Sequence, residues 1–353
     1  MNYSTYNVTL QEETTIPWTS VDTSTDYYYE DEGLSHVSDI LSQFSMVIYS
    51  FAFVLGTVGN GLVIFFTGFM MKRTVNVVWF LNLAIADFIF TFFLPLSISY
   101  VALNFHWPFG NFMCKLNSTI AFVNLYASVF LLTVISIDRF ISVMFPVWCQ
   151  NHRTPRLASF VAIGVWILAC IFSLPYFIFR DTDAYNDAVV CFNNFHEDKN
   201  IAFSRHKITV VVRFIASFLI PFSVIIFCYS VILLRIKRNH MTTSSKPFKI
   251  ILAVIISFFV CWVPYHIFSF MELFVGHDNF RFDYIVFVGT PLTSSLAFIN
   301  SCINPILYVF MGRDFKQKFQ SSIRSIFERA FSEDSVQADL RSKTKSTSDS
   351  QLV

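Results

Sequence analysis

Arg213 is the residue with the clearest chemical meaning, because it lies inside a long apolar segment at positions 208–231. A guanidinium keeps its proton in a membrane, and burying it in a spanning helix costs about 2.5–3.5 kcal/mol even on lenient insertion scales. We therefore expect Arg213 to face a wet cavity that opens on one side of a membrane. Its charge would attract a ligand that is anionic or rich in carbonyl oxygens. The alternative is a structural arginine that pairs with a polar group on a neighbouring helix.

A second set of polar side chains interrupts other apolar segments and could gather around Asp87. A single carboxylate in a bilayer needs partners, so this cluster could hold water or a small cation such as sodium. The alternative is a set of hydrogen bonds between helices, each worth about 0.6–2 kcal/mol. The set comprises Asn60, Asp87, Asn124, Ser128, Asn300, Ser301 and Asn304.

The elements that carry these residues are predicted to be membrane-spanning helices. The 353 residues are 54% hydrophobic and only 14% charged, whereas soluble domains carry about 25% charged residues. Seven segments have the ~20 apolar residues needed to cross a bilayer, and their length argues against a β-barrel. They are 44–70, 77–103, 112–144, 157–179, 208–234, 250–274 and 284–310. The predicted fold is an all-α seven-helix bundle, with Pro264 kinking the sixth helix.

Basic residues concentrate in the loops after the first, third and fifth segments and after the seventh. By the positive-inside rule, the N-terminus is extracellular and the C-terminus cytoplasmic, and we expect a multi-pass protein of the plasma membrane. We divide the chain into four parts. These are a flexible acidic tail (1–42), the bundle (43–311), an amphipathic helix on the inner membrane surface (312–331) and a disordered tail rich in Ser and Thr (332–353).

Both tails carry candidate modification sites. Asn2 and Asn7 stand in glycosylation sequences, and Tyr27, Tyr28 and Tyr29 stand among acids that would steer a basic ligand. Sulfation of these tyrosines is a hypothesis, and unmodified tyrosines are the simpler alternative. Phosphorylation of the C-terminal hydroxyls would create an acidic patch for a basic partner, where the alternative is a merely solvated end. The hydroxyls are Ser332, Ser335, Ser342, Thr344, Ser346, Thr347, Ser348 and Ser350.

Of the seven cysteines, only Cys114 and Cys191 are predicted to face the oxidising side of the membrane. Cys114 stands at the outer mouth of the third segment, and Cys191 stands in the middle of the loop between the fourth and fifth segments. A disulfide bond between them would hold this loop over the bundle. The other five cysteines are predicted to be small core hydrophobes.

Several short motifs fall in order along the predicted helices and resemble those of the rhodopsin-like (class A) G-protein-coupled receptors. The resemblance is specific because seven motifs stand in the right segments, and it covers nearly the whole chain outside the tails. The motifs are Gly59-Asn60, Leu83-Ala84-Ile85-Ala86-Asp87, Asp138-Arg139-Phe140, Trp166, Pro221 with Tyr229, Cys261-Trp262-Val263-Pro264 and Asn304-Pro305-Ile306-Leu307-Tyr308. The resemblance implies a receptor rather than an enzyme.

Within that class the chain looks like the chemerin (chemokine-like) receptors, which are near relatives of the formyl-peptide receptors. The segments that carry this resemblance are 105–110, 150–153, 179–182, 191–195 and 332–335. Arg213 matches an arginine with which the formyl-peptide receptors hold peptide oxygens, but Phe122 stands where their pocket has an acid. This departure favours a chemerin-type peptide or protein ligand over N-formyl-methionine. We assign ligand contacts to Arg213, Phe122 and Phe192, with Glu272 and His266 tuning the entrance; for His266 the alternative is a satisfied histidine that lines the bundle.

The resemblance also implies an activation switch. Arg139 would pair with Asp138 at rest and be released to a cytoplasmic partner, although Phe140 replaces the commoner tyrosine. The remaining parts would be a lever in the sixth helix and two tyrosines that meet near Arg139 when that helix swings outward. The switch residues are Asp138, Arg139, Tyr229, Trp262, Pro264 and Tyr308. The partners implied are inhibitory G proteins, receptor kinases, arrestins and membrane lipid.

Other classes of protein fit less well. Retinal binding needs a lysine that segment 284–310 lacks, and the sequence around His196 lacks the second histidine of a zinc motif. We therefore expect no catalytic residues, no metal centre and no nucleic-acid partner. A transporter would show internal repeats. The strongest rivals are a receptor for formyl peptides or anaphylatoxins and a non-signalling scavenger receptor, although the Asp138-Arg139 motif that scavengers usually lack is intact.

Overall fold

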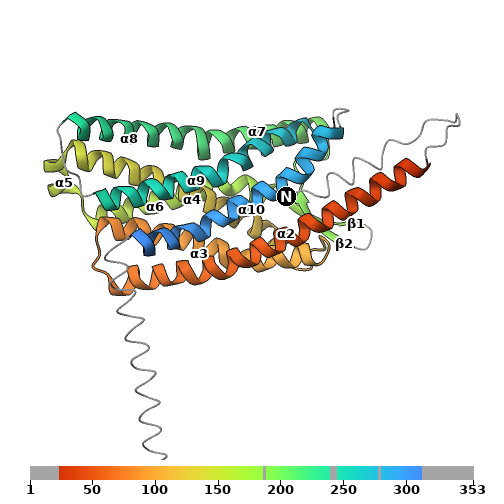
Figure 1. Ribbon diagram of the computed structural model, residues 1–353, viewed down its shortest axis with the longest axis horizontal. Coiled ribbons are helices and arrows are strands. Elements are labelled where there is room, and N and C mark those ends of the chain that lie inside the picture. The colour runs from red at the N-terminus through yellow and green to blue at the C-terminus, as the bar shows by residue number, and fades with distance from the viewer. Residues whose placement is uncertain (1–23, 186–187, 239–244, 277–279, 312–353) are drawn as a thin grey trace, which may run out of the picture.

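A computed structural model of the chain describes residues 24–185, 188–238, 245–276 and 280–311. In this part of the chain, seven helical spans are long and apolar enough to cross a membrane, which confirms the predicted fold. The spans lie alongside one another as a bundle (Figure 1). A β-hairpin lies at one end of the bundle and a short helix, α5 (Pro146–His152), lies at the other. We call these the hairpin end and the α5 end.

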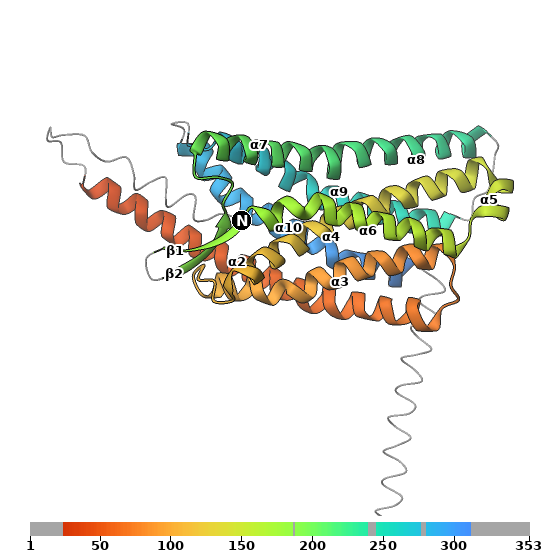
Figure 2. The same cartoon turned by 180° about the vertical axis from the view of Figure 1, so that it is seen from behind.

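The helices are longer than the predicted apolar segments, because hydropathy marks only the part of a helix that lies in hydrocarbon. The first helix begins at Ser24 rather than at position 44, and its first turns project beyond the bundle at the hairpin end (Figure 2). The first four spans are α2 (Ser24–Phe65) with its π-helical end η1 (Phe66–Met70), α3 (Val75–Ala102), α4 (Gly110–Met144) and α6 (Pro155–Ile178). The sixth and seventh spans are α9 (Ser245–Met271), followed by the 3-10 turn η3 (Glu272–Phe274), and α10 (Phe280–Met311).

The fifth span consists of α7 (Lys199–Phe214), the π-helical segment η2 (Ile215–Leu219) and α8 (Ile220–Arg238). The widened turn directly precedes Pro221. A proline has no N–H to donate, and its ring collides with the carbonyl of the preceding turn, so the helix widens there instead of breaking. The widening begins two residues after Arg213.

Side-chain caps fix where three of the helices start. The Thr74 hydroxyl accepts a hydrogen bond from the Val77 N–H at the start of α3, and Thr154 does the same for α6. The Asp198 carboxylate accepts from the N–H groups of Asn200 and Ile201 and so begins α7. Such caps satisfy N–H groups that have no partner inside the helix. The caps therefore fix the residues at which the preceding loops end and α3, α6 and α7 begin.

The third span, α4, is central to the bundle and packs against α3, α6 and α8. Its inner face is fully buried, as Leu125, Val129 and Leu131 show. In contrast, Ile163, Ile167 and Ile171 of α6 are more than half exposed in the protein alone, which is the surface expected to contact lipid. A polar tie joins α6 to α3, where Trp166 Nε1 donates to Asn82 Oδ1 at 2.9 Å.

The hairpin consists of β1 (Arg180–Tyr185) and β2 (Ala188–Asn193), which pair antiparallel with Arg180 opposite Asn193. The sequence pattern predicts only a loop here, because a pair of short strands gives no hydropathy signal beside seven long apolar helices. The predicted disulfide bond between Cys114 and Cys191 is confirmed and ties β2 to the first turn of α4. The Trp107 N–H donates to the Val189 carbonyl at 2.7 Å. The hairpin is thus fixed over the bundle from two sides.

Loss of the disulfide is expected to destabilise this arrangement. Replacing Cys114 and Cys191 together by serine opens a closed loop of 77 residues, for which loop entropy predicts a loss of about 4.5 kcal/mol. The thermal unfolding midpoint of the purified protein in detergent should fall. Cys149→Ser, which removes a free cysteine, is the control and should leave the midpoint in place. Equal midpoints for all three proteins would contradict this role of the bond.

Candidate functional site

A cavity enters the bundle from the hairpin end and reaches down to Trp262. Its volume is about 220 Å³. Three of the residues to which ligand contacts were assigned line it, namely Phe122, Arg213 and Glu272. The hairpin contributes Arg180 to the upper wall. A space of this size admits the end of a polypeptide chain but not a folded domain.

Arg213 lies in the cavity wall with 7% of its surface exposed. Its guanidinium carbon is 5.5 Å from the centre of the Phe122 ring and 5.0 Å from that of Tyr265. Each cation–π contact contributes roughly 0.5–2 kcal/mol. Within the described residues, however, Arg213 Nε has no hydrogen-bond partner, and a buried charged donor left without a partner is costly. The side chain is therefore positioned by the protein and left ready to donate to something in the cavity.

Arg180 is a second buried cation in the cavity wall. Its guanidinium donates to Asn193 Oδ1 and to the Cys191 carbonyl, both at 3.0 Å. Burial lowers the pKa of Arg180 to about 10, against a small opposing effect of Tyr100, so the group is fully charged at neutral pH. In the sequence Arg180 was one loop residue among several. Only the alternation of the strand could have indicated that it faces inward.

Phe122 occupies the position at which the formyl-peptide receptors were expected to carry an acid. Its ring stacks on Tyr176 at 3.3 Å between centres and 12° between planes. The Arg213 guanidinium also lies over the Phe122 ring. The cavity therefore surrounds its inner cation with aromatic rings rather than with a carboxylate, and the nearest carboxylate among the lining residues is Glu272 in the turn η3.

The structure does not bring two of the assigned contacts, Phe192 and His266, to this cavity. Successive side chains of a strand point to opposite sides, so Cys191 and Asn193 line the cavity while Phe192 points away. His266 is buried, 3.4 Å from the Ser217 hydroxyl, and lines a separate apolar groove beside α7 and α9. His266 follows Tyr265 in α9, and one residue along a helix corresponds to a rotation of 100° about its axis. The His266 side chain therefore leaves the face of α9 that lines the cavity.

A buried polar cluster lies around Asp87, as the sequence predicted. Asn304 Nδ2 donates to Asp87 Oδ2 at 2.8 Å. Asn124 Nδ2 donates to the Ser301 hydroxyl at 2.9 Å, and the Ser128 hydroxyl donates to Asn124 Oδ1 at 3.2 Å. The residues come from α3, α4 and α10, so the cluster joins three spans.

The cluster also has unused polar atoms. Asn60 Nδ2 donates to the Ser301 carbonyl at 2.8 Å. Within the described residues, however, Asn60 Oδ1, Asp87 Oδ1, Asn300 Nδ2 and Asn304 Oδ1 are buried without a hydrogen-bond partner. Buried polar atoms are nearly always satisfied. Water or a small cation coordinated by oxygen would satisfy free oxygens among these, and the oxygen-rich donor set fits such a cation.

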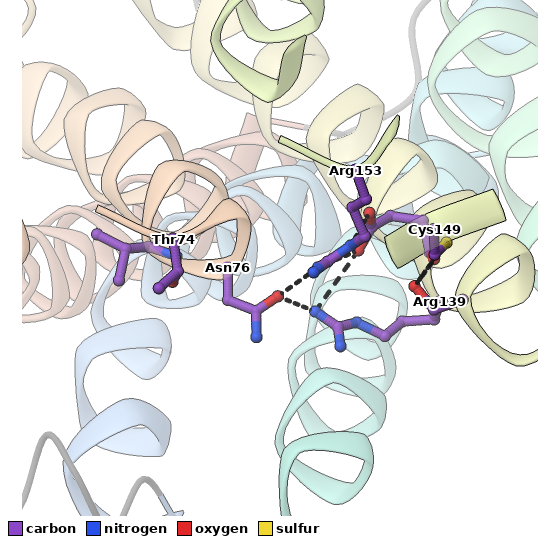
Figure 3. Close-up of polar contacts among 8 residues, drawn as sticks. Thr74, Asn76, Arg139, Cys149 and Arg153 are labelled. Atoms are coloured by element: carbon purple, nitrogen blue, oxygen red, sulfur yellow. Dashed lines mark hydrogen bonds and ion pairs between the residues drawn. The ribbon is translucent and has the colours of Figure 1, made fainter. Parts of the chain in front are cut away.

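The third polar group, which we call the Asp138 centre, lies at the α5 end and includes the predicted switch pair of Asp138 and Arg139. Arg139 and Asp138 form the expected ion pair at 3.6 Å. The structure adds two partners that the sequence analysis did not assign, Asn76 of α3 and Arg153 directly after α5 (Figure 3). In the sequence, Arg153 is a basic loop residue that bears on topology and belongs to the segment 150–153 that carries the family resemblance. No sequence pattern pairs it with Asp138, because the contact depends on how α5 folds back.

The other switch residues are placed along the sixth, fifth and seventh spans. Trp262 is buried at the cavity floor, with its ring 5.9 Å from Phe258 and 5.5 Å from Tyr265. Pro264 follows within α9. Tyr229 is buried in α8. The side chain of Tyr308 lies outside the described residues, as do Asn2, Asn7, the side chains of Tyr27–29, segment 312–331 and the C-terminal hydroxyls.

Comparison with known proteins identifies the class of protein. The family described as "7 transmembrane receptor (rhodopsin family)" matches residues 59–308, which include the cavity floor, the Asp87 cluster and the Asp138 centre. The chain belongs to this family of G-protein-coupled receptors, which are receptors and not enzymes.

Individual relatives show which receptors of this family the chain resembles. The chain is 46% identical to chemerin-like receptor 1 of Homo sapiens over 304 residues, which cover 82% of this chain and 80% of that protein. It is 45% identical to chemerin-like receptor 2 of Macaca fascicularis over 306 residues, covering 86% of each chain. Chemerin-like receptor 1 of Mus musculus is 47% identical over 304 residues, covering 82% and 81%. The predicted resemblance to the chemerin receptors is confirmed.

Acid should destabilise the hairpin over the cavity, because it protonates the Asp181 carboxylate. Its carboxylate accepts from Asn111 Nδ2 at 2.6 Å and from the Thr182 N–H at 2.9 Å. Partial burial raises the pKa of Asp181, but these hydrogen bonds and the charge of Lys115 outweigh it and hold the pKa below the usual 3.8. A carboxyl with a lowered pKa stabilises the fold above its unfolded pKa, and this contribution is lost as pH falls through the lowered value.

We therefore expect the unfolding midpoint of the wild-type protein to fall more steeply below about pH 4 than that of Asp181→Asn. The midpoint should be measured in detergent from pH 6 to pH 3. Asp183→Asn, on an exposed position of the same strand, controls for a general loss of negative charge and should follow the wild type. Parallel curves for wild type and Asp181→Asn would show that this tie is unimportant.

Proposed function

We propose that this chain is a cell-surface G-protein-coupled receptor for a peptide or protein chemoattractant of the chemerin type, signalling through inhibitory G proteins and arrestin in chemotaxis and inflammation. The observation that carries the proposal is Arg213, a buried cation with a free donor in a cavity that admits a chain end. The similarity to chemerin-like receptors over more than four-fifths of the chain supports the ligand class.

The cavity suits the C-terminal residues of such a ligand. Carboxylate and carbonyl oxygens would accept from Arg213 at depth and from Arg180 beneath the hairpin, and the lining aromatic rings would hold apolar side chains. The folded body of the ligand would rest on the hairpin and on the acidic N-terminal tail. Glu272 would favour a basic or neutral group near the entrance. A formyl-peptide ligand is the weaker candidate, because Phe122 and Tyr176 fill the place of the acid with a ring stack.

The disulfide bond supports the orientation of the chain. Disulfides form and persist on the oxidising side of a plasma membrane, and Cys114–Cys191 lies at the hairpin end. The hairpin end and the cavity mouth would therefore be extracellular. The Asp138 centre and α5 would be cytoplasmic, where Arg139 would meet the G protein and where phosphorylated tail hydroxyls would meet arrestin.

Activation then requires a ligand that binds one state of the bundle more tightly than the other. A ligand that reaches the cavity floor would press on Trp262, whose helix carries Pro264 two positions further along. A proline interrupts the hydrogen bonds of its helix, so α9 has a place at which its cytoplasmic half can swing. The intact Asp138–Arg139 pair distinguishes this proposal from a scavenger without signalling.

Substituting Arg213 tests the ligand site. Arg213→Ala removes charged hydrogen bonds worth about 1.5–3 kcal/mol each, so the potency of a chemerin-type C-terminal peptide should fall by about 10-fold to 100-fold. Potency should be measured by suppression of cyclic AMP, alongside surface expression. Arg213→Lys should retain part of the potency. Lys207→Ala, which removes an exposed charge from the same helix, is the control, and unchanged potency in Arg213→Ala at normal expression would refute the site.

We also propose that the Asp87 cluster holds a sodium ion that favours the resting state. Asp87→Asn removes the charge, so agonist affinity should lose its sensitivity to sodium. Affinity should be compared in sodium and in potassium at equal ionic strength, because general salt screening acts alike in both. A wild-type receptor that responds equally to the two salts, or an Asp87→Asn receptor that still discriminates between them, would remove the sodium site.

A further inference from the structure

The carboxylate of Asp138 is shared by the guanidinium groups of Arg153 and Arg139. Arg139, its neighbour in sequence, is the more distant partner. Arg153 Nε lies 2.7 Å from Asp138 Oδ1, and Arg153 Nη2 lies 2.8 Å from Oδ2. This two-point geometry is the strongest that arginine forms with a carboxylate. Arg139 approaches Oδ2 only to 3.6 Å. The closest contacts of the carboxylate are therefore with Arg153 rather than with Arg139.

The two arginines also share the Asn76 side chain. Arg153 Nη2 donates to Asn76 Oδ1 at 2.8 Å, and Arg139 Nη2 donates to the same oxygen (Figure 3). The three charged side chains are 12–26% exposed, so solvent screens them only in part. Two positive charges thus compete for one carboxylate and one amide oxygen, and they repel each other.

The position of Arg153 depends on the fold of α5. This short helix turns back beside the end of α4, where Cys149 Sγ lies 3.7 Å from the Ser142 hydroxyl. Arg153 is the residue directly after α5 and directly before Thr154, which caps α6. The connection between the third and fourth spans therefore delivers a cation to the switch pair.

We propose that Arg153 is a positioning residue that competes with Arg139 for Asp138 and so lowers the free energy needed to release Arg139. Removing one partner of a buried ion pair is costly because it leaves the other charge unpaired. Here Asp138 keeps its two-point partner when Arg139 leaves, so no carboxylate is left alone. This inference rests on the proposed function insofar as released Arg139 contacts a G protein.

The competition can be measured without a G protein. A double-mutant cycle on Asp138→Asn and Arg139→Gln gives their coupling from thermal unfolding midpoints of the purified receptor in detergent. In the Arg153→Gln background Asp138 is free to pair with Arg139, so the coupling should at least double relative to the wild-type background. A coupling that stays the same or shrinks would overturn the proposal.

The consequence for signalling is measured as nucleotide exchange in membranes, normalised to surface receptor. Arg153→Gln should lower exchange without agonist by about threefold to tenfold, because the strengthened Asp138–Arg139 pair gains roughly the worth of one partly exposed ion-pair interaction. Arg153→Lys keeps the charge without the two-point geometry and should fall between. Arg156→Gln removes an exposed charge from the first turn of α6 and should behave as the wild type.

Removing Asp138 separates competition from a merely structural role. In the Asp138→Asn background, Arg153→Gln should no longer change exchange, whereas loss of loop structure would still do so. Raised or unchanged exchange in the single variant Arg153→Gln would overturn the proposal. If the wild type showed no agonist-stimulated exchange, the receptor function would fail, while the coupling measurement would still decide whether Arg153 competes.

Discussion

The constraint on which this structure depends is that hydrocarbon gives no partner to a polar group. Every charge within the bundle must therefore face the interior and find its partners there. Arg213 lies between two aromatic rings, Asp87 accepts from Asn304, and Asp138 is held by Arg153. The three polar groups are thus places where the interior departs from simple apolar packing, and they are also the places proposed for function.

One helix connects these places. The third span, α4, contributes Phe122 to the ligand cavity, Asn124 and Ser128 to the Asp87 cluster, and Asp138 to the α5 end. Because the interior of a protein is close-packed, a shift at one level of this helix is felt at the next. One packed helix therefore joins the cavity, where the ligand is proposed to act, to the end of the bundle where Arg139 lies.

The stability of the resting state depends on which side chains pair with Asp138. A carboxylate with a single arginine partner would resist its departure, whereas Asp138 has two partners and the closer one comes from a loop. The balance between Arg139 and Arg153 would then set how readily the receptor becomes active without ligand. Such a balance is adjusted by small differences in pairing energy, which ligands shift only through differential affinity.

The sequence by itself determined the seven spans, the disulfide partners and the inward direction of Arg213, because hydropathy and the cost of burying charge act locally along the chain. Only the tertiary structure decided which neighbours meet. It turned Phe192 and His266 away from the cavity and brought Arg180 into it, since one step along a strand or helix changes the face of a side chain. It also paired Arg153 with Asp138, because that contact depends on how a loop folds back, which no local pattern records.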